Sequence, residues 1–520
     1  MNNFMSAIKN ELNNEFSYTE NSALGYRTTG KKLLDLNFSV ASLRGASEQT
    51  IINKFMDAYW EDPVVAIKWL FYTRDCREGL GERRLFRIVL KHLAQDKPEV
   101  IKAVFSFAPT YGRYDDLWCL LDTDLKKDVI SMVKKQLGED VPNMLNGKSI
   151  SLCAKWLPSE NASSKETKRY ATIIRKGLDM TSRNYRKMLS DLRKHIKVVE
   201  CKMSAKQWNE IDYEAVPSRA NLIYNNAFLR NDEERRRSYL GALEKGEAKI
   251  NASVLFPHDI VHKYTSGSWR YSLRGYDAAL EGMWKALPDT VKGNGNTLVV
   301  ADGSGSMTCN VGGNTGVTAL DVANALAIYF AERASGEFKD KYITFSERPQ
   351  FVDFSNANTL HDKIGIALRH NEVANTNIEA VFDLILQTAV NNHMAQEDIP
   401  TNILIISDME FDACASTNST EGYGWYSRRS APTSTLFNTI AKKYAAHGYK
   451  LPRLVFWNVN SRTGTIPVKE NDLGVALVSG FSVNIVNMVM SNKLDPYECL
   501  LDALNVERYQ AIEDAVKGIC

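Results

Sequence analysis

Three oxygen-bearing side chains, Asp302, Ser304 and Ser306, alternate along the stretch from Leu298 to Met307 and could together bind a cation. Glycines stand between them and let the backbone fold tightly, so that one carboxylate and two hydroxyls converge. Hard divalent cations such as Mg²⁺, Mn²⁺ and Ca²⁺ prefer oxygen ligands of this kind. An ordinary turn capped by Asp and Ser explains these residues equally well, so the interpretation depends on what the rest of the chain adds.

The elements that would position these side chains are two buried strands and a loop. Apolar residues fill Leu298–Ala301 without alternation, which predicts a strand covered on both faces. A second apolar run, Asn402–Asp408, also ends in an acid, and a threonine lies in a loop between the two runs. Ligands bind at the carboxyl ends of strands in open α/β sheets. The sequence therefore predicts one cation site at a sheet edge, formed by Asp302, Ser304, Ser306, Thr376 and Asp408.

In order and spacing, this set resembles the metal-ion-dependent adhesion site of von Willebrand factor A domains, over about residues 296 to 490. The resemblance implies a doubly wound α/β domain at 296–520, in which the two acids, two serines and threonine bind the ion directly or through water. It also implies an open coordination position for solvent or for a carboxylate of a protein partner. We expect Mg²⁺ as the cofactor, with Mn²⁺ or Ca²⁺ as alternatives. Residues 342–354 predict a hairpin at the edge of the sheet.

Composition indicates an ordinary globular protein: of 520 residues, 44% are apolar and 24% are charged, and the formal net charge is +2. A chain of this length is too long for one core, so we expect two or three domains. The eight cysteines are scattered without a CxxC pair, which disfavours a disulfide scaffold or a zinc site and fits a reducing cytoplasm. We find no apolar run of membrane-spanning length and no secretory signal, so we expect a cytoplasmic protein without a membrane partner.

Helical periodicity without strand signals predicts an all-α domain at residues 1–290, built as an irregular helical-repeat array. Residues 1–50 are polar and predict an arm with a short helix or two. Residues 292–296 are rich in Gly and Asn and predict a linker, and residues 412–434 predict a long loop beside the cation site. The periodicity also predicts helices at Pro63–Cys76, Glu82–Ala94, Glu99–Ala108, Asp115–Leu121 and Leu125–Leu137.

The segment from Asp75 to Phe86 places basic residues around a glycine turn between two amphipathic helices. On composition alone it is a solvated turn whose Arg83 and Arg84 pair with nearby acids. It also resembles the RD-x-R-x-G-x-GER element of the TROVE domain, found in the Ro60 autoantigen and its bacterial relatives. Those proteins join a ring of HEAT-like repeats to a von Willebrand factor A domain. A related prokaryotic, viral and plant branch with this layout is the closer resemblance, carried by Lys155-Trp156-Leu157-Pro158, Tyr185-Arg186-Lys187 and Val216-Pro217-Ser218.

Residues 151–210 hold fourteen Lys and Arg against six Asp and Glu, although the whole chain is nearly neutral. Several of these cations are spaced to share a helix face, and Tyr170 and Tyr185 lie among them as possible stacking surfaces for unpaired bases. A solvated helical face is the alternative, but an excess of one sign costs stability unless a polyanion binds. With the basic turn added, the candidate RNA-binding residues are Arg77, Arg83, Arg84, Lys165, Lys168, Arg169, Arg175, Lys176, Arg183, Arg186, Lys187, Arg193 and Lys194.

Three classes of function remain open. The first, which we favour, is a non-catalytic RNA-binding protein of Ro60 type, whose partner is a small structured or misfolded non-coding RNA. The second is a metal-dependent assembly module without an RNA role, in which the open metal position captures a partner's carboxylate. The third is a metal hydrolase with Asp302 as nucleophile. Phosphatases of that kind need a second Asp where this chain has Ser304, and the chain has no P-loop, so we do not expect an enzyme.

Overall fold

The computed structural model describes residues 16–265, 273–291, 296–312, 316–372, 374–412, 436–468, 474–485, 488 and 495–520. The predicted loop at 412–434 and the linker at 292–296 fall almost wholly outside these residues. The chain divides into two compact units. The sheet unit is made from residues within 1–50, 255–277 and 287–503, and the helical unit from 51–254, 278–286 and 504–520. The two units therefore exchange chain segments on both sides of the boundary that the sequence predicts near residue 290.

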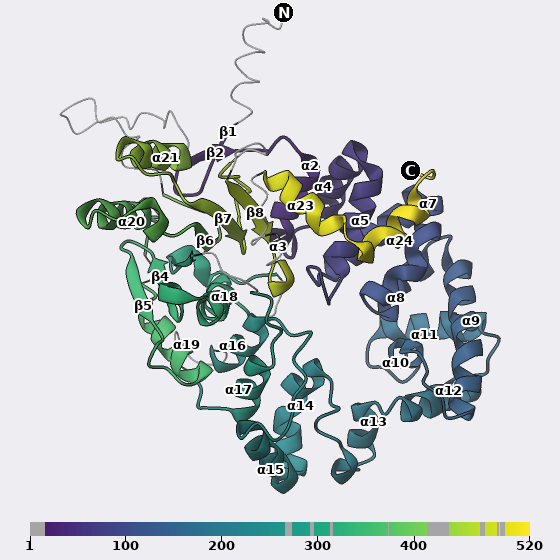
Figure 1. Ribbon diagram of the computed structural model, residues 1–520. Helices are drawn as coiled ribbons and strands as arrows, with labels where there is room; N and C mark the ends of the chain where they lie inside the picture. The colour runs from purple at the N-terminus through teal and green to yellow at the C-terminus, as the bar shows by residue number, and fades with distance from the viewer. Residues whose placement is uncertain are drawn as a thin grey trace, which may run out of the picture. The chain divides into compact units, whose positions relative to one another are not determined.

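A six-stranded sheet in the order β5–β4–β3–β6–β7–β8 is the centre of the sheet unit (Figure 1). Every neighbouring pair is parallel except β4 with β5, which is antiparallel, so the predicted edge hairpin is confirmed. The strands are β3 (Thr297–Asp302), β4 (Lys341–Phe345), β5 (Gln350–Asp353), β6 (Asn402–Ser407), β7 (Arg453–Asn458) and β8 (Val475–Ser479).

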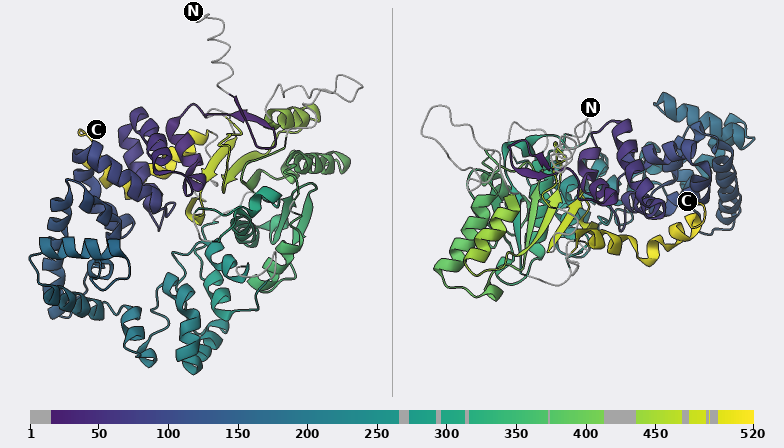
Figure 2. Two further views of the ribbon diagram at one scale, coloured as in Figure 1. Left: turned by 180° about the vertical axis from the view of Figure 1, so that it is seen from behind. Right: turned by 90° about the horizontal axis from the view of Figure 1, so that it is seen from above.

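Helices cover both faces of this sheet, among them α18 (Ala319–Arg333), α20 (Glu379–Asn391) and α21 (Leu436–Ala446). On β7, the ring of Phe456 contacts Phe437 of α21, with centroids 4.6 Å apart, and the next residue, Trp457, contacts Phe330 of α18 at 5.5 Å. Successive side chains of a strand point to opposite faces, so α21 and α18 lie on opposite sides. The green helices α20 and α21 lie side by side in Figure 2. The predicted α/β layout of this part is therefore confirmed.

Residues 16–50 belong to the sheet unit rather than to a separate polar arm, whereas the two predicted short helices are present. Strands β1 (Phe16–Tyr18) and β2 (Leu24–Tyr26) pair with each other, and α2 (Lys32–Phe38) and α3 (Val40–Leu43) follow. The two short helices are buried on apolar residues such as Leu34, and α2 packs against β8. The backbone oxygen of Phe38 accepts a hydrogen bond of 2.8 Å from Asn458 Nδ2. The segment joins the sheet unit because its apolar side chains outweigh its polar composition.

The helical unit is an array in which helices close in sequence pack on one another. The helix predicted at Asp115–Leu121 is present as a 3₁₀ helix over residues 114–122. The end of the next helix needs correction, because that helix continues eight residues past Leu137, through Pro142. None of the described helices is long and apolar enough to span a membrane. In chain order the principal elements are α4 (Glu48–Glu61), α5 (Pro63–Arg74), α6 (Arg84–Asp96), α7 (Pro98–Val104), α8 (Ala108–Tyr111), η2 (Tyr114–Asp122), α9 (Lys126–Leu145), α10 (Cys153–Trp156), α11 (Lys165–Gly177), α12 (Ser182–His195), α13 (Val199–Ser204), η3 (Trp208–Glu210), α14 (Ser218–Asn231), α15 (Glu233–Glu244), α17 (Ala278–Lys285) and α24 (Glu507–Val516).

Local sequence fixes where the two most basic helices begin. The Ser164 hydroxyl accepts a hydrogen bond from the backbone N–H of Thr167 at the start of α11, and Thr181 does the same for Asn184 at the start of α12. Such caps satisfy amide groups that a helix start otherwise leaves unpaired. Each helix then buries a narrow apolar stripe and exposes its remaining surface.

Candidate functional site

The loop after β3 is folded by its own polar groups. The backbone N–H of Ser304 donates to Asp302 Oδ1 at 2.8 Å, and the Ser304 and Ser306 hydroxyl oxygens are 3.0 Å apart. The second oxygen of Asp302 accepts from the Ser407 hydroxyl at 2.5 Å. Asp302 and Ser304 are buried, with 1% and 0% of their surface exposed. The loop thus directs one carboxylate and two hydroxyls inward.

Asp408 lies beside this loop because β6 is the parallel neighbour of β3 and ends at the same level. Its carboxylate is buried and accepts a hydrogen bond of 3.3 Å from the backbone N–H of Glu410. Burial raises the pKa of Asp302 to about 6, and burial together with the charge of Asp302 raises the pKa of Asp408 to about 7. A bound cation would remove the mutual repulsion of the two carboxylates.

Thr376 completes the predicted set from a third loop. The backbone N–H of Gly305 donates to the oxygen of Ala374 at 3.0 Å, and the N–H of Asp412 donates to the oxygen of Thr376 at 3.0 Å. These bonds join the Thr376 loop to both strand ends. Thr376 itself is buried, with 1% of its surface exposed. The structure therefore brings the three predicted loops together at the carboxyl edge of the sheet.

The donor set suits a hard cation, because two carboxylates and three hydroxyls supply only oxygen. Among the described residues, no group of three or more His, Cys, Asp or Glu side chains could hold a metal ion. Asp302 and Asp408 are only two acids, so hydroxyl and water oxygens would have to complete the coordination of a cation.

Sequence reasoning missed the N-terminal segment, which reaches this edge. Asn21 Nδ2 donates to Thr376 Oγ1 at 3.2 Å and to the backbone oxygen of Glu410 at 2.7 Å. The backbone N–H of Glu20 donates to Glu410 Oε2 at 2.8 Å, and the Thr19 hydroxyl donates to the oxygen of Phe411 at 2.6 Å. The segment thus fixes the orientation of one predicted cation ligand.

Two further charged residues lie next to the predicted site. The fully buried Glu410 accepts hydrogen bonds at 2.8 Å from the backbone N–H groups of Arg462 and Thr463. The guanidinium of Arg462 is 3.6 Å from Asp408 Oδ2 and also pairs with Glu20. Arg462 therefore supplies positive charge beside the two acids.

The helical unit carries the second candidate surface, on α11 and α12. Within the described part of the chain, six exposed cations of these helices make no side-chain hydrogen bond or ion pair; we call them the basic face. Arg186 is also exposed and hydrogen-bonds only a carbonyl of its own helix. The basic face consists of Lys165, Lys168, Lys176, Arg183, Lys187 and Lys194.

Three other predicted RNA contacts have partners inside the helical unit. Arg169 makes a bidentate ion pair with Asp122, at 2.5 and 2.8 Å. Arg175 donates to Glu160 at 2.8 Å. Arg193 donates to the backbone oxygens of Ala154 and Leu157 and to the Ser159 hydroxyl, at 2.6 to 2.9 Å. The arrangement of these arginines is explained by the fold itself.

The expectation that both tyrosines offer stacking surfaces is wrong for Tyr185. That side chain is fully buried, and its hydroxyl donates to the oxygen of Pro158 at 2.9 Å. Tyr170 is half-buried, its hydroxyl donates to Asp122, and the guanidinium of Arg169 lies 4.6 Å from its ring centroid. One face of the Tyr170 ring is therefore already covered.

The glycine turn after α5 is mainly a buried ionic network. Asp75 is fully buried and accepts from Arg508 Nη2 at 2.9 Å and from the Tyr509 hydroxyl at 3.0 Å, both on α24. Arg74 pairs with the buried Asp116 at 2.7 Å. A Cβ at Gly79 would lie 2.0 Å from the oxygen of Tyr72, so this close approach requires glycine.

The three arginines of the turn differ in their partners. Arg77 is exposed and donates through Nη1 to the oxygen of Thr110 at 3.2 Å. Arg83 is exposed, but desolvation of its guanidinium together with the charges of Arg113 and Arg87 lowers its pKa to about 10, and Arg84 has an interaction partner. The contacts of this turn with α24 hold that helix on the rest of the helical unit. The fold itself therefore explains the residues of this turn that resemble the TROVE element.

With this geometry in hand, comparisons identify the relatives of the chain. Two family models match, both described as domains of unknown function: DUF2828 over residues 19–106 and 161–297, and DUF7788 over residues 296–514. "Uncharacterized protein L728" of Acanthamoeba polyphaga mimivirus is 30% identical over 532 residues, which cover 94% of this chain and 87% of that protein. The chain belongs to the L728 family.

Among solved structures, this L728-family chain is similar to the crystal structure of Deinococcus radiodurans RO (RSR) protein. The match covers 86% of this chain and 91% of that chain, at 14% sequence identity and a TM-score of 0.34. A TM-score this low supports no inference about fold or function.

Proposed function

We propose that this chain is a non-catalytic RNA-binding protein whose basic face on α11 and α12 contacts the backbone of small structured or misfolded non-coding RNAs. The observation that carries the proposal is the group of six exposed cations that lack an internal partner. Unneutralised charge of one sign destabilises a folded unit by self-repulsion, and a polyanion relieves that repulsion. The TROVE resemblance of the sequence supports RNA as the polyanion.

A charge-matched pair of variants tests the proposal. Lys165→Ala, Lys168→Ala and Lys187→Ala together remove three cations of the basic face. Lys339→Ala, Lys442→Ala and Lys450→Ala remove three exposed cations of the sheet unit instead. Fluorescence anisotropy with a small structured RNA measures the affinity of each protein at several salt concentrations.

We expect the first variant to bind more weakly and with less salt dependence, because the slope of log affinity against log salt changes by about 0.7 to 0.9 per phosphate contact. The second variant should match the unchanged protein. If both variants lose the same amount of RNA affinity, the basic face is only a solvated surface and the proposal is refuted.

A second function concerns the sheet unit, where we propose a divalent-cation site that holds a partner's carboxylate. The buried, mutually repelling pair Asp302 and Asp408 favours it, since a cation stabilises both ionised acids. Ser304, Ser306 and Thr376 would supply the remaining protein ligands. A bound ion would act here as a fixed positive charge for an incoming carboxylate, and we propose no chemical step.

Titration with Mn²⁺, followed by electron paramagnetic resonance, tests this site without any partner. One ion per chain should bind, and Asp302→Ala should abolish binding while RNA affinity stays unchanged. If Asp302→Ala leaves Mn²⁺ binding intact, the cation site is refuted.

A further inference from the structure

The helical unit contains an open cleft of about 690 Å³ beside the basic face. The end of α12, helix α13, η3 and the loop before α14 form its walls. Its volume falls in the range of pockets that hold ligands the size of a nucleotide, about 300 to 1,000 Å³.

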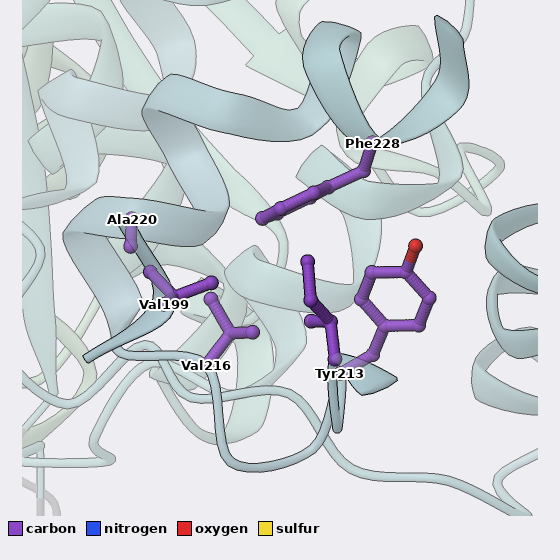
Figure 3. Close-up of a cluster of buried hydrophobic side chains, with 6 residues drawn as sticks. Val199, Tyr213, Val216, Ala220 and Phe228 are labelled. Carbon is purple, nitrogen blue, oxygen red and sulfur yellow. The ribbon is translucent and has the colours of Figure 1, made fainter. Parts of the chain in front are cut away.

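The floor of the cleft is apolar and fixed. Val199, Ile211 and Val216 line it and also belong to a buried cluster with Tyr213 and Phe228. Figure 3 shows the side chains of this cluster turned toward one another. Because the same residues serve the core and the floor, the cleft is formed before any ligand binds.

Three lysines line the cleft. Lys194 belongs to the basic face, and Lys197 follows α12 with a φ of +58°, which turns the chain at the mouth of the cleft. Lys202 donates to the backbone oxygen of Glu210, so its ammonium group is held at the rim. Glu210 and Asp212 also line the cleft and bring acceptor oxygens to it.

We propose that this cleft holds one unpaired nucleotide of the RNA that the basic face binds. The base lies on the apolar floor, and the phosphate contacts Lys194 and Lys197. Duplex RNA cannot present a base in this way, whereas single-stranded segments present splayed bases to proteins. The inference rests on the proposed RNA-binding function and adds a preference for unpaired ends or loops.

Alkylation of Cys201 can report whether a ligand occupies the cleft, because this cysteine lines the cleft and is partly exposed. Alkylation of each cysteine by a maleimide can be followed by mass spectrometry, with the exposed Cys309 of the sheet unit as internal control. A saturating single-stranded oligoadenylate of five nucleotides should slow alkylation of Cys201 about tenfold and leave Cys309 unchanged.

A cleft-filling variant separates this site from the rest of the surface. Ala215 is exposed and lines the cleft, so Ala215→Trp fills it without disturbing the core, and Ala511→Trp on α24 is the matched control. Ala215→Trp should weaken oligoadenylate binding about tenfold and keep the affinity for duplex RNA. Ala511→Trp should change neither.

The outcomes distinguish the two proposals. If duplex and oligoadenylate bind but Cys201 is not protected, or Ala215→Trp binds oligoadenylate normally, the nucleotide cleft is overturned and the basic face stands. If the unchanged protein binds neither RNA, both proposals are overturned.

Discussion

Replacing Asp75 by Asn should loosen the C-terminal helix α24 from the helical unit. The Asp75 carboxylate is fully buried and accepts two hydrogen bonds from Arg508, one from the Tyr509 hydroxyl and one from the backbone N–H of Arg77. Asn has nearly the same size but no charge. The guanidinium of Arg508, whose side chain is only 20% exposed, would lose its main counter-charge.

The expected magnitude follows from the environment of this pair. Removing one partner of a buried ion pair costs about 3 to 5 kcal/mol. Glu78 lies 3.6 Å from Arg508 and is 61% exposed, so it compensates in part and points to the lower value. A loss of about 3 kcal/mol corresponds to roughly 100-fold faster amide exchange in α24 where local opening governs exchange.

Hydrogen–deuterium exchange with mass spectrometry measures this quantity helix by helix. The matched control is Asp128→Asn, because Asp128 pairs with Lys102 at 3.8 Å and the two side chains are 34% and 54% exposed. Exposed pairs of this kind contribute about 0 to 1 kcal/mol. If α24 exchanges at the same rate in Asp75→Asn and Asp128→Asn, the buried network does not hold this helix and our account of the glycine turn is refuted.

Further predictions concern the two candidate sites. Mn²⁺ affinity should fall by about two orders of magnitude from about pH 7.5 to about pH 5.5. The pKa values of Asp302 and Asp408 are raised to about 6 and about 7, so both carboxylates take up protons in this range, and these protons compete with the ion. Mn²⁺ titrations that do not change with pH would contradict this. Asn21→Ala should weaken Mn²⁺ binding about tenfold, since Thr376 loses the group that orients it, and an unchanged titration would deny that role. Arg193→Ala should lower the urea midpoint by the equivalent of about 2 kcal/mol, because three internal acceptors lose their donor, and an unchanged midpoint would argue against a structural role.

The strands and the cation motif could be predicted because their signals are local. An apolar run that ends in Asp marks both β3 and β6, and parallel pairing brings the two ends together. Contacts between distant segments leave no such signal. Asn21 and Thr376 are 355 positions apart, and Asp75 and Arg508 are 433 apart. In the sequence, each of these four residues resembles an ordinary polar residue of the surface.

The burial of Tyr185 could have been predicted from periodicity. Tyr185, Leu189 and Leu192 follow a helical spacing of four and three, and all three form the buried stripe of α12. The lysines and arginines around these residues instead favour the interpretation of the segment as a charged surface. The internal partners of Arg169, Arg175 and Arg193 could not be predicted, because Asp122, Glu160 and the carbonyl of Ala154 reach them only through the packing of other helices.

Ultraviolet crosslinking of the full chain to RNA in its native cells, with identification of the crosslinked peptides, tests the central proposal most directly. Our account predicts crosslinks to small non-coding RNAs on peptides from α11 and α12, lost when Lys165, Lys168 and Lys187 are replaced by Ala. Crosslinks confined to the sheet unit, or no RNA above background, would contradict it and favour the cation-dependent assembly module.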